Sequence, residues 1–198
     1  MKILRTISPK QFDFEDVHFK NVVLKNASLT SRKFDNCLFE HCEFHDINFS
    51  DSRFAECQFR HCLLSIVDLK SCKLNDVSFA DCKLIGLDFS GCNPIFLDFR
   101  FENCIISSAN FSGMKLPDLQ FGESVVKECD FIDANLENAA FCGCDLEGSQ
   151  FSHTTLTKAD FTSAKNYRID PRNNKLAKAK FSLPEAIALL EMMEITVE

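Results

Sequence analysis

The sequence predicts an all-β solenoid, and three observations support this. A bulky apolar residue recurs at every fifth position over most of the chain. A small residue precedes each bulky one by two positions. The period of five matches neither the α-helix, near 3.6, nor the β-strand, at 2. A short fixed repeat over most of a chain is typical of a solenoid, in which each coil stacks on the next.

The repeat is clearest between Val126 and Ala164. We denote the bulky position i, so the small residue lies at i−2. The bulky residues are Phe131, Leu136, Phe141, Leu146, Phe151, Leu156 and Phe161. The small residues are Cys129, Ala134, Ala139, Cys144, Ser149, Thr154 and Ala159. The same frame extends back to Ile106, so we expect one repeat block over residues 106–164.

An earlier block over residues 12–99 repeats in a shifted frame, with Phe or Leu at i from Phe14 to Phe89 and again at Phe99. Because Ile106 lies seven residues after Phe99, about two residues are inserted, as at a β-bulge. We expect the frame break at residues 100–105, within the stretch from Pro94 to Cys104. Phe96 and Phe101 are then candidate loop contacts for a partner.

These residues resemble the pentapeptide-repeat family, whose motif is a small residue, a polar one, Leu or Phe, and two polar ones. The resemblance covers about three quarters of the chain and implies a right-handed quadrilateral β-helix with one pentapeptide per side. Residues twenty apart would then stack at roughly 4.8 Å. Positions i and i−2 would point inward, and the Asn, Asp and Gly residues at i+2 would suit corners with positive φ.

The register predicts buried structural thiols rather than a metal site. Ten of the eleven cysteines occupy i−2, where Cys acts as a small buried hydrophobe, and Cys142 at i+1 should face solvent. His41 and His61 point outward in this register, whereas Cys42 and Cys62 point inward, so they cannot share a metal. We expect no metal ligands. The odd number of thiols favours a reducing compartment.

Composition favours one repeat domain with a short C-terminal segment outside the repeat. It gives little support to an enzymatic function. No Ser/His/Asp set, Gly-rich loop or ligand cluster brings polar groups together, so we expect no catalytic residue and no cofactor. No apolar run is long enough to span a bilayer, and the N-terminus lacks the apolar region of a signal peptide. We therefore expect a cytoplasmic protein without a membrane partner.

Charge is uneven along the chain. Between Lys20 and Arg100 the net charge is −1. The stretch from Asp118 to Glu147 contains eight acidic residues and one basic residue, Lys127, so its net charge of −7 equals that of the whole chain. The acids are Asp118, Glu123, Glu128, Asp130, Asp133, Glu137, Asp145 and Glu147. For a generic domain this would be a solubilising surface. On a regular rod, acids can line up like phosphates, so we treat these eight as a candidate partner-binding surface.

The ends of the chain leave the repeat. Residues 1–11 should cap the first coil, because an open coil end exposes unpaired strand edges. In residues 165–198, Ser182 and Glu185 read as a capping box that starts a helix running to about Met193. Its apolar arc of roughly 220° is wider than one coil end requires, which predicts a homodimer. The candidate interface residues are Leu183, Ile187, Leu189, Leu190, Met193 and Ile195. Ile195 to Val197 alternates like a strand.

The tail sharpens the resemblance. NYRID followed by KAKFSLPEAIALL resembles the C-terminal segment of the albicidin-resistance and quinolone-resistance, gyrase-protecting, pentapeptide proteins. That resemblance implies a head-to-head homodimer whose acidic rod mimics DNA, binds DNA gyrase or topoisomerase IV and protects against gyrase poisons, without direct nucleic-acid binding. A two-fold axis at the tail would join two acidic stretches into one surface. The alternative is a non-enzymatic interaction scaffold for another protein partner.

Overall fold

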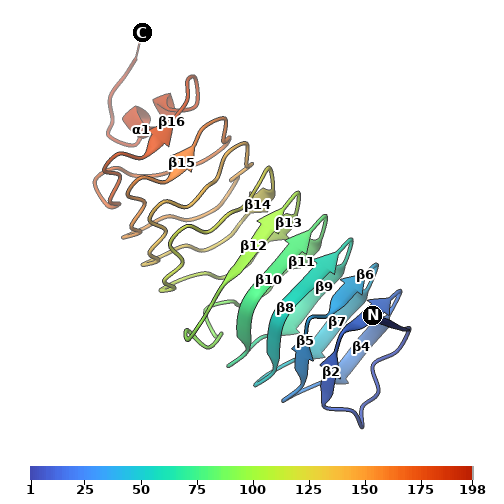
Figure 1. Cartoon of the computed structure of the whole chain (residues 1–198). Helices are drawn as coiled ribbons and strands as arrows, with labels where there is room; N and C mark the ends of the chain where they lie inside the picture. The colour runs from blue at the N-terminus through green and yellow to red at the C-terminus, as the bar shows by residue number, and fades with distance from the viewer. Residues whose placement is uncertain (198) are drawn as a thin grey trace.

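A computed structural model describes residues 1–197 and shows a right-handed quadrilateral β-helix of about eight coils with one short helix. The coils stack into a rod with the N-terminus at one end and the C-terminus at the other (Figure 1). Both the solenoid and its all-β character are therefore confirmed.

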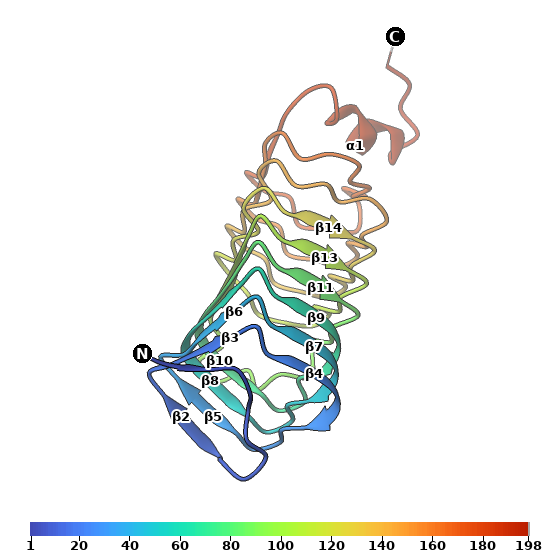
Figure 2. The ribbon, with the colours of Figure 1, turned by 90° about the vertical axis from the view of Figure 1, so that its right-hand side faces the viewer.

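The strands form parallel sheets along the rod (Figure 2). An eight-stranded sheet contains β1 (Lys2–Leu4), β2 (Asp13–Glu15), β3 (Val17–Lys20), β5 (Lys33–Asp35), β6 (Leu38–Glu40), β8 (Arg53–Arg60), β10 (Lys73–Ala80) and β12 (Phe99–Glu102). A six-stranded sheet contains β4 (Val23–Ser28), β7 (Glu43–Asn48), β9 (Leu63–Asp68), β11 (Lys83–Ile85), β13 (Ile105–Ser107) and β14 (Val125–Lys127). A last pair joins β15 (Asp160–Phe161) to β16 (Lys180–Phe181).

The ladder sets which residues stack. In the first block Phe34 pairs with Phe54, twenty residues on. In the second block the same offset continues through isolated bridges, such as Asn110 with Asp130. Each outward position therefore repeats as a column along the rod, one coil apart. We number the four sides by the second-block residue in each core stack: side 1 contains Phe121, side 2 Val126, side 3 Phe131 and side 4 Leu136.

The core of side 1 is an unbroken column of stacked phenylalanine rings. It contains Phe19, Phe39, Phe59, Phe79, Phe101, Phe121, Phe141, Phe161 and Phe181, and neighbouring centroids lie 4.5 to 5.4 Å apart. Burying each ring contributes about 1.5–3 kcal/mol, and the offset stacking adds about 0.5–1.5 kcal/mol. One shape of side chain is thus selected repeatedly, which explains the abundance of Phe.

The frame break lies earlier than residues 100–105. Phe99 pairs with Val77 and Phe101 pairs with Phe79, so Phe99 occupies i−2 and Phe101 occupies i of the resumed frame. The two extra residues fall between Asn93, still bonded to Cys72 one coil below, and Asp98, bonded to Leu74. The assignment of Phe99 to i was wrong because the count by fives passed through the insertion.

This register also corrects one candidate contact. Phe101 is buried at 2% exposure and cannot serve as a loop contact, because it belongs to the side 1 column. Phe96, at 82% exposure, is the residue that the insertion pushes outward.

The N-terminal end is closed by an extra strand and a buried arginine. Strand β1 pairs with β3 and lengthens the ladder, while Ile7 enters the core. Arg32 is a charged residue at an inward i−2 position and is only 5% exposed. Its guanidinium lies 4.0 Å from the centroid of the Phe12 ring and donates a hydrogen bond to the Pro9 carbonyl at 2.8 Å. Residues 5–12 are thereby fastened onto the first coil.

The C-terminal helix is shorter than expected. Helix α1 spans Ile187–Glu191, and its N-cap residue, Ala186, makes no side-chain capping bond. The capping box does not form, because the Ser182 hydroxyl instead accepts a hydrogen bond from the Ser163 amide at 2.8 Å. The alternation from Ile195 to Val197 produces no strand in the described chain. Within residues 1–197, no helix has both the length and the apolar character needed to cross a bilayer.

The burial of the thiols follows the predicted register. All eleven cysteines are free, ten are buried and Cys142 is exposed. Burial raises the pKa of Cys129 and that of Cys144 to about 12. The pKa of Cys142 is raised by its partial burial and by the charge of Asp160. Cys129 and Cys144 are therefore protonated at neutral pH and shielded from solvent.

We expect native protein to present one readily alkylated thiol, Cys142, and all eleven after denaturation. Because the pKa of Cys142 is raised, its alkylation should be slow at pH 7 and faster near pH 9, since the thiolate is the nucleophile. Mass spectrometry after timed iodoacetamide treatment measures this, and Cys142→Ser is the control that should remove the native signal. Several modified thiols in folded protein would contradict the register.

Candidate acidic interaction face

The eight acids predicted as one surface do not share a side. Glu123 follows side 1; Glu128, Asp145 and Glu147 lie along side 2; Asp130 and Asp133 lie along side 3; Asp118 and Glu137 lie along side 4. A run of thirty residues covers one and a half coils, or roughly 7 Å of rod height. The acidic stretch is thus a belt around the rod rather than a stripe along it.

Part of the belt is neutralised. The Lys127 ammonium lies 2.9 Å from Asp145 and 2.7 Å from Glu147, and these carboxylates raise its pKa. Partial burial opposes ionisation of Asp145, but hydrogen bonds from Asn166 and Lys127 outweigh it and lower the pKa. Glu137 pairs with Lys158 at 3.1 Å. These three carboxylates are therefore poor candidates for contact with a cationic partner.

Side 3 gathers acids along the rod instead. We define the acidic face as side 3 with the corner that precedes it. Its acids are Asp46, Asp51, Asp68, Asp88, Glu128, Asp130 and Asp133. The ladder aligns Asn48 with Asp68 and runs from Asp88 through Asn110 to Asp130. The face spans four coil steps, roughly 20 Å, and within it Lys70 is the single Lys or Arg at an outward position between residues 46 and 133.

Within residues 1–197, the carboxylates of this face have no Lys or Arg within 4.0 Å. Asp133 approaches only His153, at 3.9 Å. Local hydrogen bonds set their direction: the Lys70 amide donates to Asp68 at 2.9 Å, and the Ser90 amide donates to Asp88 at 3.0 Å. This bond to a backbone N–H two residues on is the Asx-type turn that Asp and Asn favour. In Asp88 the hydrogen bonds from the Ser90 amide and hydroxyl both fall on one oxygen, whereas in Asp68 the second oxygen accepts a hydrogen bond from the Ser50 hydroxyl at 3.0 Å.

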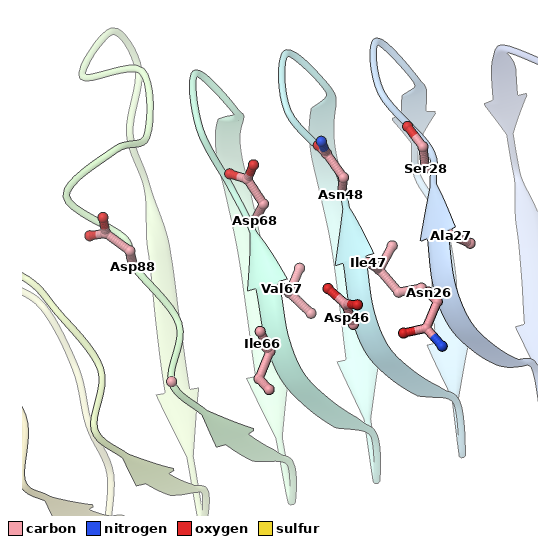
Figure 3. A pocket seen from close by; sticks show the side chains of 11 residues that line it. Asn26, Ala27, Ser28, Asp46, Ile47, Asn48, Ile66, Val67, Asp68 and Asp88 are labelled. Atoms are coloured by element: carbon pink, nitrogen blue, oxygen red, sulfur yellow. The ribbon is translucent and has the colours of Figure 1, made fainter.

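The acidic face contains a groove of about 580 Å³ (Figure 3). It crosses β4, β7, β9 and the coil that follows. Asp46, Asp68 and Asp88 line it, and so does Ile66, which is 58% exposed and lies in one row with Asp46 (Figure 3). All residues that line the groove belong to the first repeat block. The block in which acidic and basic residues nearly cancel therefore contributes part of the acidic face.

The first-block acids were missed because charge was counted along the chain. Between Lys20 and Arg100 acids and bases nearly cancel, but the bases mostly lie on other sides. Lys33, Arg53 and Lys73, for example, form one column on side 4. Writing the sequence in rows of twenty residues, with the two inserted residues left out, would have shown the acidic and basic residues in different columns.

The predicted dimer residues divide into two groups. Leu189 and Ala188 pack against the last coil, and Ile187 is half-buried, so Leu189 caps this chain rather than facing outward. Leu183, Leu190, Met193 and Ile195 are exposed by 77, 38, 42 and 46%. Arg172 fixes the segment by donating to the Met192 carbonyl at 2.8 Å while pairing with Asp170.

A basic coil separates the acidic face from this end. Residues 158–180 contain seven basic residues and two acidic ones, Asp160 and Asp170. The bases are Lys158, Lys165, Arg168, Arg172, Lys175, Lys178 and Lys180. The acidic belt therefore does not reach the end of the rod, which revises the picture of one continuous acidic surface across a two-fold axis. Among the described residues, no group of three His, Cys, Asp or Glu side chains is placed to hold a metal ion.

Comparison with known families settles what the rod is. The sequence model described as "Pentapeptide repeat region" matches residues 32–95 and 94–181. The chain belongs to the pentapeptide-repeat family. No curated protein sequence matches it significantly.

Solved structures show the same fold. Full-length QnrB1, described as a plasmid-mediated fluoroquinolone resistance protein, superposes with a TM-score of 0.73 at 22% identity, over 98% of this chain and 96% of QnrB1. A trypsin-treated QnrB1 variant gives the same score and identity over 99% and 96%. HetL, a pentapeptide repeat protein involved in heterocyst differentiation regulation from the cyanobacterium Nostoc sp. strain PCC 7120, gives a TM-score of 0.36, too low to support an argument, at 16% identity over 86% of this chain and 87% of HetL.

Proposed function

We propose that this pentapeptide-repeat protein mimics DNA, binds DNA gyrase or topoisomerase IV and protects it against quinolone- or albicidin-type poisons. The observation that carries the proposal is the acidic face, whose seven carboxylates have no Lys or Arg within 4.0 Å among residues 1–197 and lie along one side of the rod. The likeness of the whole chain to the QnrB1 fold supports it. A topoisomerase partner would place the protein in the cytoplasm.

The charge density of the acidic face suits such mimicry. Seven acids over roughly 20 Å give about one charge per 3 Å of rod, close to the ~3.4 Å spacing of phosphates along one DNA strand. A basic DNA saddle would meet these charges at fixed positions, because the ladder and the Asx-type bonds hold them. Electrostatic complementarity of this kind chiefly raises the association rate and the specificity.

We further propose a homodimer through the C-terminal segment. Leu183, Leu190, Met193 and Ile195 leave an apolar surface at the rod's end, and a second copy related by a two-fold axis is the simplest cover. The dimer would present two acidic faces flanking two adjacent basic coils. The saddle of a type II topoisomerase is itself two-fold symmetric, so each half would receive one acidic face.

The first test concerns the acidic face. Replacing Asp88, Asp130 and Asp133 with Lys keeps outward positions outward, so the fold should persist. We expect gyrase affinity to fall at least tenfold at low salt, with loss of protection in a supercoiling assay containing a quinolone. Wild-type binding should weaken as salt rises towards physiological levels. Surface plasmon resonance measures the affinity.

Its control makes the same charge change on another side. Asp16, Asp35 and Glu56 lie along side 4, and their replacement with Lys should alter gyrase binding much less. If both triple variants bind as wild type does, acidic mimicry is not the mechanism. If wild-type protein does not bind gyrase at all, the chain is an interaction scaffold for another protein.

The second test concerns the dimer. Leu190→Asp would bury a charge at the interface, which costs several kcal/mol, so the dimer dissociation constant should rise at least 100-fold. Because Leu190 is 38% exposed in the monomer, the β-rich circular dichroism should survive. Multi-angle light scattering measures the mass. Val23→Asp, at an exposed apolar position near the other end, should stay dimeric; a monomeric wild type at micromolar concentration would refute the proposal.

A further inference from the structure

Ile66 is an anomaly in the acidic face. It occupies a corner with φ of 54°, in a column whose other members in the neighbouring coils are Asn26, Asp46 and Gly86. A β-branched residue is disfavoured in this left-handed region, where Gly, Asn and Asp are the usual choices. Its side chain is nevertheless 58% exposed. The position therefore combines an unfavourable backbone with an apolar group that this chain leaves largely uncovered.

The space beside Ile66 is open. The next residue of its column, Gly86, has no side chain, and a Cβ placed there would find no atom within 4 Å. Ile47 and Val67 are buried beneath and form an apolar floor (Figure 3). An aliphatic side chain entering over Gly86 would contact Ile66 from the side.

Charge defines what else the occupant must carry. Asp46, Asp68 and Asp88 rim the groove, and no Lys, Arg or His is among the described residues that line it. In the described chain none of the three has a Lys or Arg partner within 4.0 Å, and the hydrogen-bond donors to Asp68 and Asp88 are neutral serine or backbone groups. Phosphates would be repelled by this rim, whereas ammonium or guanidinium groups would be attracted.

We propose that the groove binds an extended peptide segment of a partner protein that carries an aliphatic side chain between lysines or arginines. The aliphatic side chain packs over Gly86 against Ile66, and the cationic groups reach the rim carboxylates. In an extended segment, successive side chains on one face lie about 6.6–6.8 Å apart. The rim residues Asp46, Asp68 and Asp88 come from three successive coils, each roughly 4.8 Å from the next. This inference does not depend on gyrase being the partner.

The test uses a fluorescein-labelled peptide in which Lys, Leu and Lys are separated by single serines, so that all three side chains lie on one face of the extended chain. The comparison peptide carries Glu in place of each Lys. Fluorescence anisotropy should show saturable binding of the lysine peptide alone. Ile66→Asn should weaken binding of the lysine peptide about tenfold or more, because the leucine of the peptide loses its apolar contact with Ile66. Asn suits the left-handed corner, so the melting temperature should stay equal or rise.

Ile105→Asn is the matched control, since Ile105 is 45% exposed on side 2 outside the groove, and it should bind as wild type does. Asp68→Lys should weaken binding of the lysine peptide at least tenfold and reduce its salt dependence. Equal affinity of wild type and Ile66→Asn, or no binding of the lysine peptide at millimolar concentration, would overturn the proposal. Neither result bears on the gyrase experiment, and failure to bind gyrase would leave this one intact.

Discussion

The parallel hydrogen-bonded ladder that stacks residue n on residue n+20 is the constraint on which the rest of the molecule depends. It places each Phe ring against an identical neighbour and lines up the small i−2 residues. It also turns every outward position into a column at roughly 4.8 Å spacing. Surface chemistry is therefore organised by column, and neighbours along the chain diverge onto different sides within ten residues.

That geometry explains which parts were predictable from sequence. Burial at i and i−2 is a local rule, so the core, the ten buried thiols and exposed Cys142 follow from a repeat visible by inspection. The acidic face is not a local property. Asp68 and Asp130 are 62 positions apart in the sequence yet belong to one column, whereas Glu123 and Glu128 adjoin in the repeat but follow different sides. A linear count of charge predicts composition and says little about a face.

The remaining departures from the repeat lie at an insertion and at the two ends of the rod. Phe99 looks like another i residue because it is ten positions from Phe89, and only its pairing with Val77 reveals the changed frame. Arg32 occupies a small-residue position because the N-terminal segment supplies a ring and a carbonyl to cover its guanidinium. Ser182 had a plausible local partner in Glu185, but a tertiary bond to Ser163 took its hydroxyl. The Phe99 error comes from the insertion, whereas at Arg32 and Ser182 a contact between distant segments overrides the local pattern.

The insertion between Asn93 and Asp98 implies an asymmetry in how this architecture tolerates changes of length. The two additional residues are accommodated by an outward bulge at exposed Phe96. Beyond the bulge the ladder resumes, with Phe99 paired with Val77 and Phe101 paired with Phe79. A side that lost one residue could not be accommodated in the same way, because five residues are needed to span one side and reach the next corner. Growth by loops is thus open to such a rod at any corner, while contraction must remove whole coils of twenty to preserve every column above the cut.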